Sequence, residues 1–300
     1  MGNHKNIINV CAKEKQGEPN TQFFQVWRPH ETGYTGSIKT IQILSANAYD
    51  IAYRNQYLTF TPQDLLIDDL IDFPQTKSHS IISEIKEFWK KEKLFKECGF
   101  IYKRGVLLHG PPGSGKTALI MQLAKELIKD NGIVFFCTSP GVCKEGIQMF
   151  RKIEPSRNLI IILEDLDLLI EKFEENLFLS LLDGEDGTHN VVFIATTNYP
   201  EKLEKRFTNR PSRFDCVVKV ELPNEETRKL YLQHKIKLNP QELEKWVSST
   251  VGLSLAHLKE IIISVKCFSR DFEESLKTVK NMKATLKSDS NSRIGLLSEN

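Results

Sequence analysis

The sequence predicts an α/β fold in which a parallel five-stranded sheet is flanked by helices and followed by a small all-α domain. Five apolar runs alternate with segments of helical periodicity: the first starts near residue 106, and the others cover 133–138, 159–163, 191–196 and 216–222. These runs are continuously apolar, which is typical of parallel strands covered on both faces. Beyond Asn224 the sequence shows helical periodicity and no further strand, which predicts a separate helical domain.

These patterns divide the chain into four predicted parts. They are a small α/β appendage of unknown role (1–60), the α/β core (61–223), a helical lid domain (224–287) and a disordered polar tail (288–300). A chain of 300 residues is long enough to bury a sizeable core.

The N-terminal appendage has the weakest pattern. Apolar runs at 23–28 and 37–44 predict two strands. Tyr49, Tyr53 and Tyr57 then follow at four-residue spacing, which predicts three rings on one face of a short helix. Such a stripe is usually packed into a core, and a partner-docking surface is the alternative.

Helices are expected between the strands of the core. Ser80 is a candidate N-cap for a helix that ends at Gly99. Later helices are predicted at 118–129, around 146–153 and at 171–182.

The composition limits the classes of partner. With 41 basic against 39 acidic residues, the net charge of +2 does not favour nucleic acid or an anionic membrane by bulk electrostatics. No window approaches the roughly 20 apolar residues that span a bilayer. The six cysteines include no CxxC pair, so we expect reduced thiols in a cytoplasmic protein rather than a zinc site.

The most informative stretch is VLLHGPPGSGKTAL, an apolar strand followed by a glycine-rich turn and a helix start. Its turn fills the pattern GxxxxGK[ST], in which glycines let successive N–H groups wrap an anion at a helix N-terminus. Lys116 is expected to reach the β- and γ-phosphates of ATP, and the Thr117 hydroxyl to ligate Mg²⁺. The predicted nucleotide-binding residues are Gly110, Pro111, Pro112, Gly113, Ser114, Gly115, Lys116, Thr117 and Ala118.

Two acids follow the buried run 159–163 directly. Carboxylates at the carboxyl end of a strand, facing the cradle, suit both Mg²⁺ and a water nucleophile. We therefore assign Glu164 to the metal and Asp165 to polarising the attacking water, although either residue could be the base. Solvated acids at a strand end are the alternative interpretation.

Polar residues of a second kind follow the run 191–196. Asn198 could orient the lytic water by a hydrogen bond, or it could be an ordinary turn residue before a proline. Arg206, Arg210 and Arg213 come next. An arginine supplied by a neighbouring subunit can stabilise charge on the γ-phosphate, and surface salt bridges are the alternative.

These motifs, in this order and spacing, resemble those of an AAA-type ATPase over roughly residues 75–270. The matching segments are GPPGSGKT, LIIILEDLD, FLSLLDGEDG, FIATTNYPEKL and NRPSRFD. The resemblance implies a P-loop NTPase fold that binds ATP and Mg²⁺ and forms a ring, commonly a hexamer, with ATP at the subunit interfaces. It further implies that Asn198 is the sensor asparagine, that Arg210 and Arg213 act on the neighbouring subunit, and that Ala256 lies near the nucleotide.

Three features depart from the family pattern. Most members have Asp-Glu where this chain has Glu164-Asp165, an inversion shared by the mitochondrial branch that translocates the folded Rieske protein, and a shorter base predicts slow hydrolysis. The segment TSPGVCKEGIQMF lacks the aromatic loop that grips polypeptide in the central pore. Ser212 replaces the usual glycine between the two arginines.

The leading functional hypothesis is an oligomeric ATPase that couples ATP hydrolysis to remodelling of a macromolecule, with protein as the expected client. The alternative is a slow, ATP-controlled assembly switch or loader that acts on a nucleic-acid complex. A P-loop kinase fits less well, because it accounts for neither the arginine pair nor Asn198.

Overall fold

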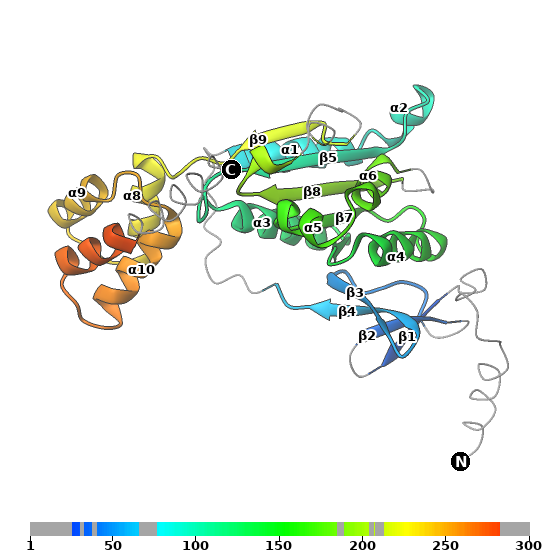
Figure 1. The fold of residues 1–300 in the computed structure, drawn as a ribbon, viewed down its shortest axis with the longest axis horizontal. Helices are drawn as coiled ribbons and strands as arrows, with labels where there is room; N and C mark the ends of the chain where they lie inside the picture. The colour runs from blue at the N-terminus through cyan, green and yellow to red at the C-terminus, as the bar shows by residue number, and fades with distance from the viewer. Residues whose placement is uncertain are drawn as a thin grey trace, which may run out of the picture.

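The computed structural model describes residues 26–30, 33–37, 41–65, 77–184, 189–203, 207 and 213–282 (Figure 1). The predicted tail at 288–300 lies outside the described residues.

The predicted five-stranded parallel sheet is confirmed. Its order is β6-β7-β8-β5-β9, and each neighbouring pair is parallel. The strands are β5 (Lys103–His109), β6 (Ile133–Phe136), β7 (Leu159–Leu163), β8 (Val191–Thr197) and β9 (Cys216–Lys219). Because β5 and β7 are both neighbours of β8, their carboxyl ends bring the glycine-rich turn and the two acids close together.

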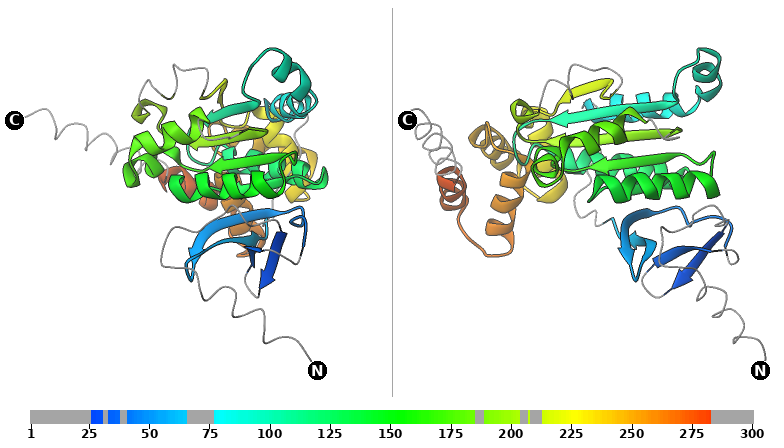
Figure 2. Two further views of the ribbon diagram at one scale, coloured as in Figure 1. Left: turned by 90° about the vertical axis from the view of Figure 1, so that its right-hand side faces the viewer. Right: turned by 45° about the vertical axis from the view of Figure 1, so that its right-hand side comes forward.

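Four N-terminal strands extend the same sheet to nine strands. They are β1 (Val26–His30), β2 (Gly33–Ser37), β3 (Ala48–Arg54) and β4 (Tyr57–Gln63), in the order β1-β2-β4-β3, and β3 pairs in parallel with β6. The N-terminal strands therefore form one edge of the core sheet, as the views in Figure 2 show. The predicted boundary between residues 60 and 61 falls inside β4.

The predicted tyrosine-bearing helix is wrong. Tyr49 and Tyr53 belong to β3, and Tyr57 begins β4. The two strands are joined by Asn55 and Gln56, both with positive φ (50° and 68°), as in the tight turns that match strand twist. A spacing of four residues also places side chains on one face of a strand, so it did not discriminate between helix and strand.

The N-terminal strand predictions hold only in part. The first described strand starts at Val26, and β2 (33–37) lies almost entirely between the two runs predicted as strands. In the described part of 37–44, Ile41 forms only an isolated bridge with Trp27. Trp27 packs edge-on against Phe60.

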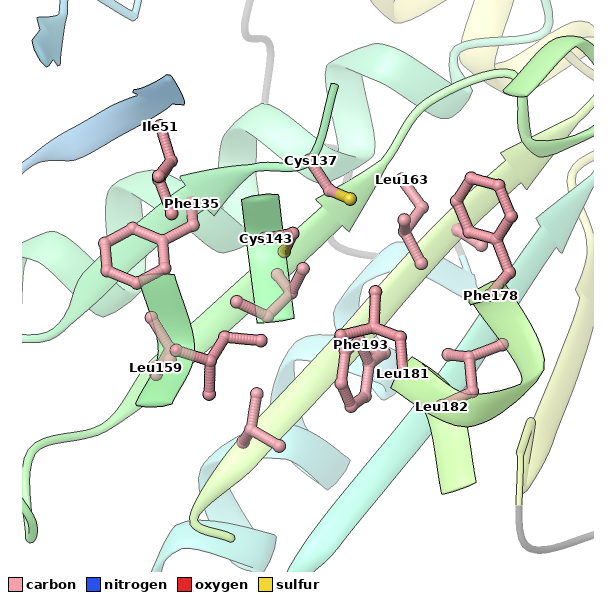
Figure 3. Close-up of a cluster of buried hydrophobic side chains, with 14 of the residues drawn as sticks. Ile51, Phe135, Cys137, Cys143, Leu159, Leu163, Phe178, Leu181, Leu182 and Phe193 are labelled. Carbon is pink, nitrogen blue, oxygen red and sulfur yellow. The ribbon is translucent and has the colours of Figure 1, made fainter. Parts of the chain in front are cut away.

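One face of the sheet is covered by α4, α5 and α6, and the other by α1 and α3. The helices are α1 (Lys77–Trp89), α2 (Glu92–Glu97), α3 (Lys116–Lys129), α4 (Pro140–Ile153), α5 (Leu166–Lys172) and α6 (Glu175–Asp183). Figure 3 shows the core under α4 and α6, where Ile51 of β3 lies beside Phe135 of β6. The N-terminal strands and the core thus share one hydrophobic cluster.

Three helix predictions need correction. Ser80 lies inside α1 rather than at its N-cap, and the helix expected to reach Gly99 is divided into α1 and α2. The segment 171–182 is likewise divided between α5 and α6. The helix expected around 146–153 begins earlier, at Pro140, because proline is favourable in the first turn.

The C-terminal helices form a helical domain with a hydrophobic core of its own (Figure 1). It contains α8 (Glu225–Lys235), α9 (Pro240–Ser249), α10 (Leu255–Lys266) and the helical residues 272–282. Its own core includes Trp246, stacked on Phe272 with ring centroids 4.3 Å apart. Among the described residues, no helix is long and apolar enough to cross a membrane.

Candidate nucleotide-binding site

The turn between β5 and α3 has the backbone geometry of an anion cradle. Gly110, Gly113 and Gly115 have φ of 156°, 73° and 104°. A Cβ added at Gly110 would lie 2.1 Å from the carbonyl oxygen of Val220, so only glycine fits there. Lys116 follows as the first residue of α3, whose N-terminal dipole favours an anion at this turn.

The helical domain contacts the cradle through the start of α10. A Cβ added at Gly113 would lie 2.6 Å from Ser254 Oγ and 3.3 Å from Ala256 Cβ. A Cβ added at Gly115 would lie 3.9 Å from Leu255 Cδ1, an ordinary van der Waals contact. Ala256 therefore lies beside the cradle.

Lys116 is buried, with 6% of its surface exposed, and its ammonium has three acceptors. The Nζ atom donates to the carbonyl oxygens of Gly110 (2.7 Å) and Pro111 (3.1 Å) and to Asn198 Oδ1 (2.6 Å). Burial lowers the pKa of Lys116, while the nearby carboxylates of Asp165 and Asp167 act in the opposite direction.

Asn198 joins Lys116 to the acids at the end of β7. Its Nδ2 donates to Asp165 Oδ1 at 3.2 Å, while its Oδ1 accepts from Lys116. Asp165 has a left-handed backbone (φ 47°, ψ 58°), which aspartate tolerates better than most residues. The sequence-predicted lysine, asparagine and aspartate thus form one hydrogen-bonded series.

Glu164, the first acid after β7, pairs with Thr117. Burial raises the pKa of Glu164, a hydrogen bond from Thr117 lowers it, and the charge of Asp165 raises it further. A hydroxyl and a carboxylate side by side are the hard oxygen ligands that Mg²⁺ prefers. Ser114 Oγ, also in the cradle, is buried without a hydrogen-bond partner, which fits a site built to receive a polar ligand.

Three further residues of the site were not singled out from the sequence. Asp167 is buried and accepts a hydrogen bond from Thr197, and Thr196 accepts one from the backbone N–H of Asp165. A third acid in EDLD and two threonines at a strand end were the available signals, but threonine in a strand is also ordinary β-sheet packing.

Arg213 is buried and pairs with Asp183 of the same chain. It is 5% exposed, and its guanidinium donates to both carboxylate oxygens of Asp183, at 2.9 and 2.8 Å. Action on a neighbouring subunit would require this ion pair to break. Arg206 and Arg210 lie outside the described residues.

The segment after β6 is short. Only Cys137, Thr138 and Ser139 separate β6 from α4. Val142 is half-buried and packs against the core, and the Cys137 and Cys143 thiols point into the same cluster (Figure 3). Gly146 brings α4 so close to β3 that a Cβ there would lie 2.7 Å from Ile51 Cδ1.

A cavity of about 390 Å³ lies away from the cradle, between α3 and the strands β3, β4 and β6. Its lining residues are Asp50, Gln63, Asp64, Leu65, Met121 and Phe136, and they include none of the residues assigned to nucleotide. The candidate site is therefore identified by the chemistry of the cradle residues and not by this cavity.

Comparisons with known proteins agree with this geometry. Residues 106–222 match the model of the "ATPase family associated with various cellular activities (AAA)". The chain is 31% identical to the ATP-dependent zinc metalloprotease FtsH 2 of Salinibacter ruber, over 67% of this chain and 32% of that protein. It is 29% identical to the proteasome-activating nucleotidase of Methanococcus vannielii, over 67% of this chain and 57% of that protein.

A Cdc48 homologue of Archaeoglobus fulgidus is 26% identical over 64% of this chain and 32% of its own length. The chain spans about a third of the length of the metalloproteases that it matches. The matched family segment contains the cradle, both acids and Asn198. Through residues 106–222, the chain therefore belongs to the AAA family of ATPases.

Proposed function

We propose that this protein is a Mg²⁺-dependent ATPase that hydrolyses ATP to ADP and phosphate. The observation that carries the proposal is the series Lys116, Asn198 and Asp165, hydrogen-bonded in that order beside a glycine-built anion cradle. Lys116 binds the β- and γ-phosphates, and the backbone N–H groups of the cradle surround them. ATP binding gives the Lys116 ammonium phosphate oxygens in place of some of its present acceptors.

Thr117 and Glu164 are the proposed metal ligands. Mg²⁺ bound there would offset the negative charge of the β- and γ-phosphates. The hydrogen bond between Thr117 and Glu164 supports the assignment, because it places the two oxygen atoms that would ligate Mg²⁺ next to each other.

Asp165 is the proposed base, and Asn198 orients it. The pairing of Glu164 with Thr117 leaves Asp165 as the acid that contacts Asn198. An amide is suited to this task because it donates a hydrogen bond without carrying charge. Asp165 accepts or shares the proton of the attacking water, which a neutral Asn at this position could not do.

We further propose a ring, commonly a hexamer in this family, in which Arg210 of one subunit acts on ATP in the next. The second predicted finger, Arg213, would have to leave Asp183 to do the same. Alternatively, Arg213 has a structural role through its ion pair with Asp183, and Arg210 alone contacts the ATP bound to the neighbouring subunit.

A protein client is favoured over other macromolecules. The names of two relatives, a metalloprotease and a proteasome-activating nucleotidase, refer to protein degradation. The short, core-packed start of α4 argues against a loop that pulls extended polypeptide through a pore. We therefore propose remodelling without threading, in the cytoplasm, where the free cysteines would stay reduced.

The second candidate is the slow assembly switch acting on a nucleic-acid complex. The shorter base, Asp165, favours it because slow turnover suits a switch. The net charge of +2 gives it no support. Measuring basal turnover, and whether added protein or DNA stimulates it, separates the two candidates.

A substrate-trapping pulldown tests the proposed client class. The Asp165→Asn variant should bind ATP, assemble and retain its client, whereas Lys116→Ala should not load ATP and serves as the control. Enrichment of specific proteins with Asp165→Asn over Lys116→Ala supports remodelling of protein. Enrichment of nucleic acid instead would favour the second candidate.

A further inference from the structure

Two adjacent threonines, Thr196 and Thr197, close strand β8, and both are buried. Neighbouring side chains along a strand point to opposite faces of the sheet, so the two hydroxyls reach different partners. Both partners lie in segments that carry side chains of the proposed catalytic site. The pair is therefore placed to control the geometry of that site from β8.

Thr196 contacts the backbone of Asp165. The Thr196 hydroxyl oxygen accepts a hydrogen bond from the Asp165 N–H at 2.9 Å. Asp165 is left-handed at this point, a conformation that costs free energy for any residue with a side chain. The hydrogen bond gives the Asp165 N–H a buried partner in this conformation and so helps to fix where the carboxylate points.

Thr197 contacts the segments on both sides of the site. Its hydroxyl donates to Asp167 Oδ1 at 2.6 Å and accepts from the Tyr199 N–H at 3.0 Å. These bonds use the single donor and one acceptor of the hydroxyl at the same time. Asn198 lies between Thr197 and Tyr199 in the chain. The two hydrogen bonds of the Thr197 hydroxyl therefore fix the backbone on both sides of Asn198.

We propose that Thr196 and Thr197 are positioning residues for ATP hydrolysis, Thr196 acting through Asp165 and Thr197, anchored on Asp167, acting through Asn198. This inference rests on the proposed ATPase function. Asn198 and Asp165 are joined by one bond of 3.2 Å, near the long end of the hydrogen-bond range, so a small displacement separates them. A displacement of about 1 Å at a catalytic group can cost roughly 10²-fold in rate.

The test compares Thr197→Val, which keeps the shape and removes the hydroxyl, with Thr197→Ser, which keeps the hydroxyl. Both are made in the wild-type chain and in an Asn198→Ala background, and kcat and KM for ATP are measured. In the wild type, Thr197→Val should lower kcat about tenfold or more with KM nearly unchanged, and Thr197→Ser should retain most of the activity. In the Asn198→Ala background, Thr197→Val should cause no further loss, because Thr197 acts through Asn198.

Thr196 is tested in parallel with Thr196→Val and Thr196→Ser, and only the valine variant should lose turnover. If Thr197→Val does not fold, as judged by its melting curve, Asp167→Asn takes its place, since it weakens the same anchor. It should then lower kcat in the wild type and have no further effect with Asn198→Ala.

Two results would overturn the inference while leaving the ATPase proposal intact. One is an active wild type in which Thr197→Val and Thr196→Val have wild-type kcat. The other is an equal loss from Thr197→Val in both backgrounds, which would show a structural role independent of Asn198. A folded wild type that does not hydrolyse ATP would overturn the proposed function and this inference with it.

Discussion

The Lys116 ammonium lies 2.6 Å from the amide oxygen of Asn198, so the cradle and the end of β8 are directly connected. The same amide group donates to Asp165 from its nitrogen. Asn198 therefore contacts both Lys116, which would hold phosphate, and Asp165, which would activate water. Any movement of Lys116 toward a ligand changes the environment of Asn198.

Lys116→Ala should abolish ATP binding. The ammonium makes its charged contacts inside a backbone cradle, and the same charge cannot be supplied by Lys125, an exposed residue further along α3. Titration with a fluorescent ATP analogue checks this, with Lys125→Ala as the matched control that should bind normally. Wild-type affinity in Lys116→Ala would contradict the assignment of the cradle.

Arg213→Ala should destabilise the fold. It leaves Asp183 without its bidentate partner in a mostly buried position, and loss of one member of a buried ion pair costs about 2 kcal/mol or more when the other is partly exposed. Chemical denaturation measures the change. The double variant Arg213→Ala, Asp183→Ala should be less destabilised than the sum of the single variants. Strict additivity would show that the pair contributes nothing.

Glu154→Ala should destabilise the fold where the N-terminal strands meet the core. The buried Glu154 carboxylate accepts hydrogen bonds from Trp27 Nε1 and the Leu44 N–H, both at 2.9 Å, and from Arg157. Its removal takes this acceptor from two buried donors, Trp27 Nε1 and the Leu44 N–H, which should cost roughly 3 kcal/mol in the free energy of unfolding.

The exposed pair of Lys202 and Glu171 supplies the control for Glu154→Ala. Glu171→Ala removes a surface ion pair and should leave the free energy of unfolding almost unchanged. The two variants are compared by urea denaturation followed by tryptophan fluorescence, to which Trp27, Trp89 and Trp246 all contribute. Equal effects would contradict the account of the buried network.

Val142→Ala should have little effect on client processing, because Val142 packs against the core rather than projecting from a loop. A bound client fused to a stably folded fluorescent reporter provides the assay. We expect no ATP-dependent loss of reporter fluorescence in either protein. Unfolding by the wild type that Val142→Ala removes would identify Val142 as a grip and contradict remodelling without threading.

The sequence predicted the elements whose signals are local. The strand 159–163 matches β7 to the residue, and the helix of the cradle ends at the predicted turn after Lys129. Glycine-rich phosphate loops and buried apolar strands depend on near neighbours in the chain, so their patterns are readable in isolation.

The misses come from long-range packing. The spacing of Tyr49, Tyr53 and Tyr57 fits either period. The pairing of β3 with β4 and with β6 shows that these residues lie on strands. The pair of Arg213 with Asp183 joins residues 30 positions apart and could not be read from NRPSRFD. The contacts of Thr196 and Thr197 likewise depend on the register between β7 and β8.

The most direct test of the proposed mechanism measures phosphate release and ATP affinity together for the wild type and Asp165→Asn. Asparagine tolerates the left-handed backbone and keeps the side-chain shape, so the variant changes little except the proton acceptor. The account predicts unchanged affinity and a loss of turnover of about 10²-fold or more, the range typical of a lost general base. Undiminished turnover in Asp165→Asn would contradict it.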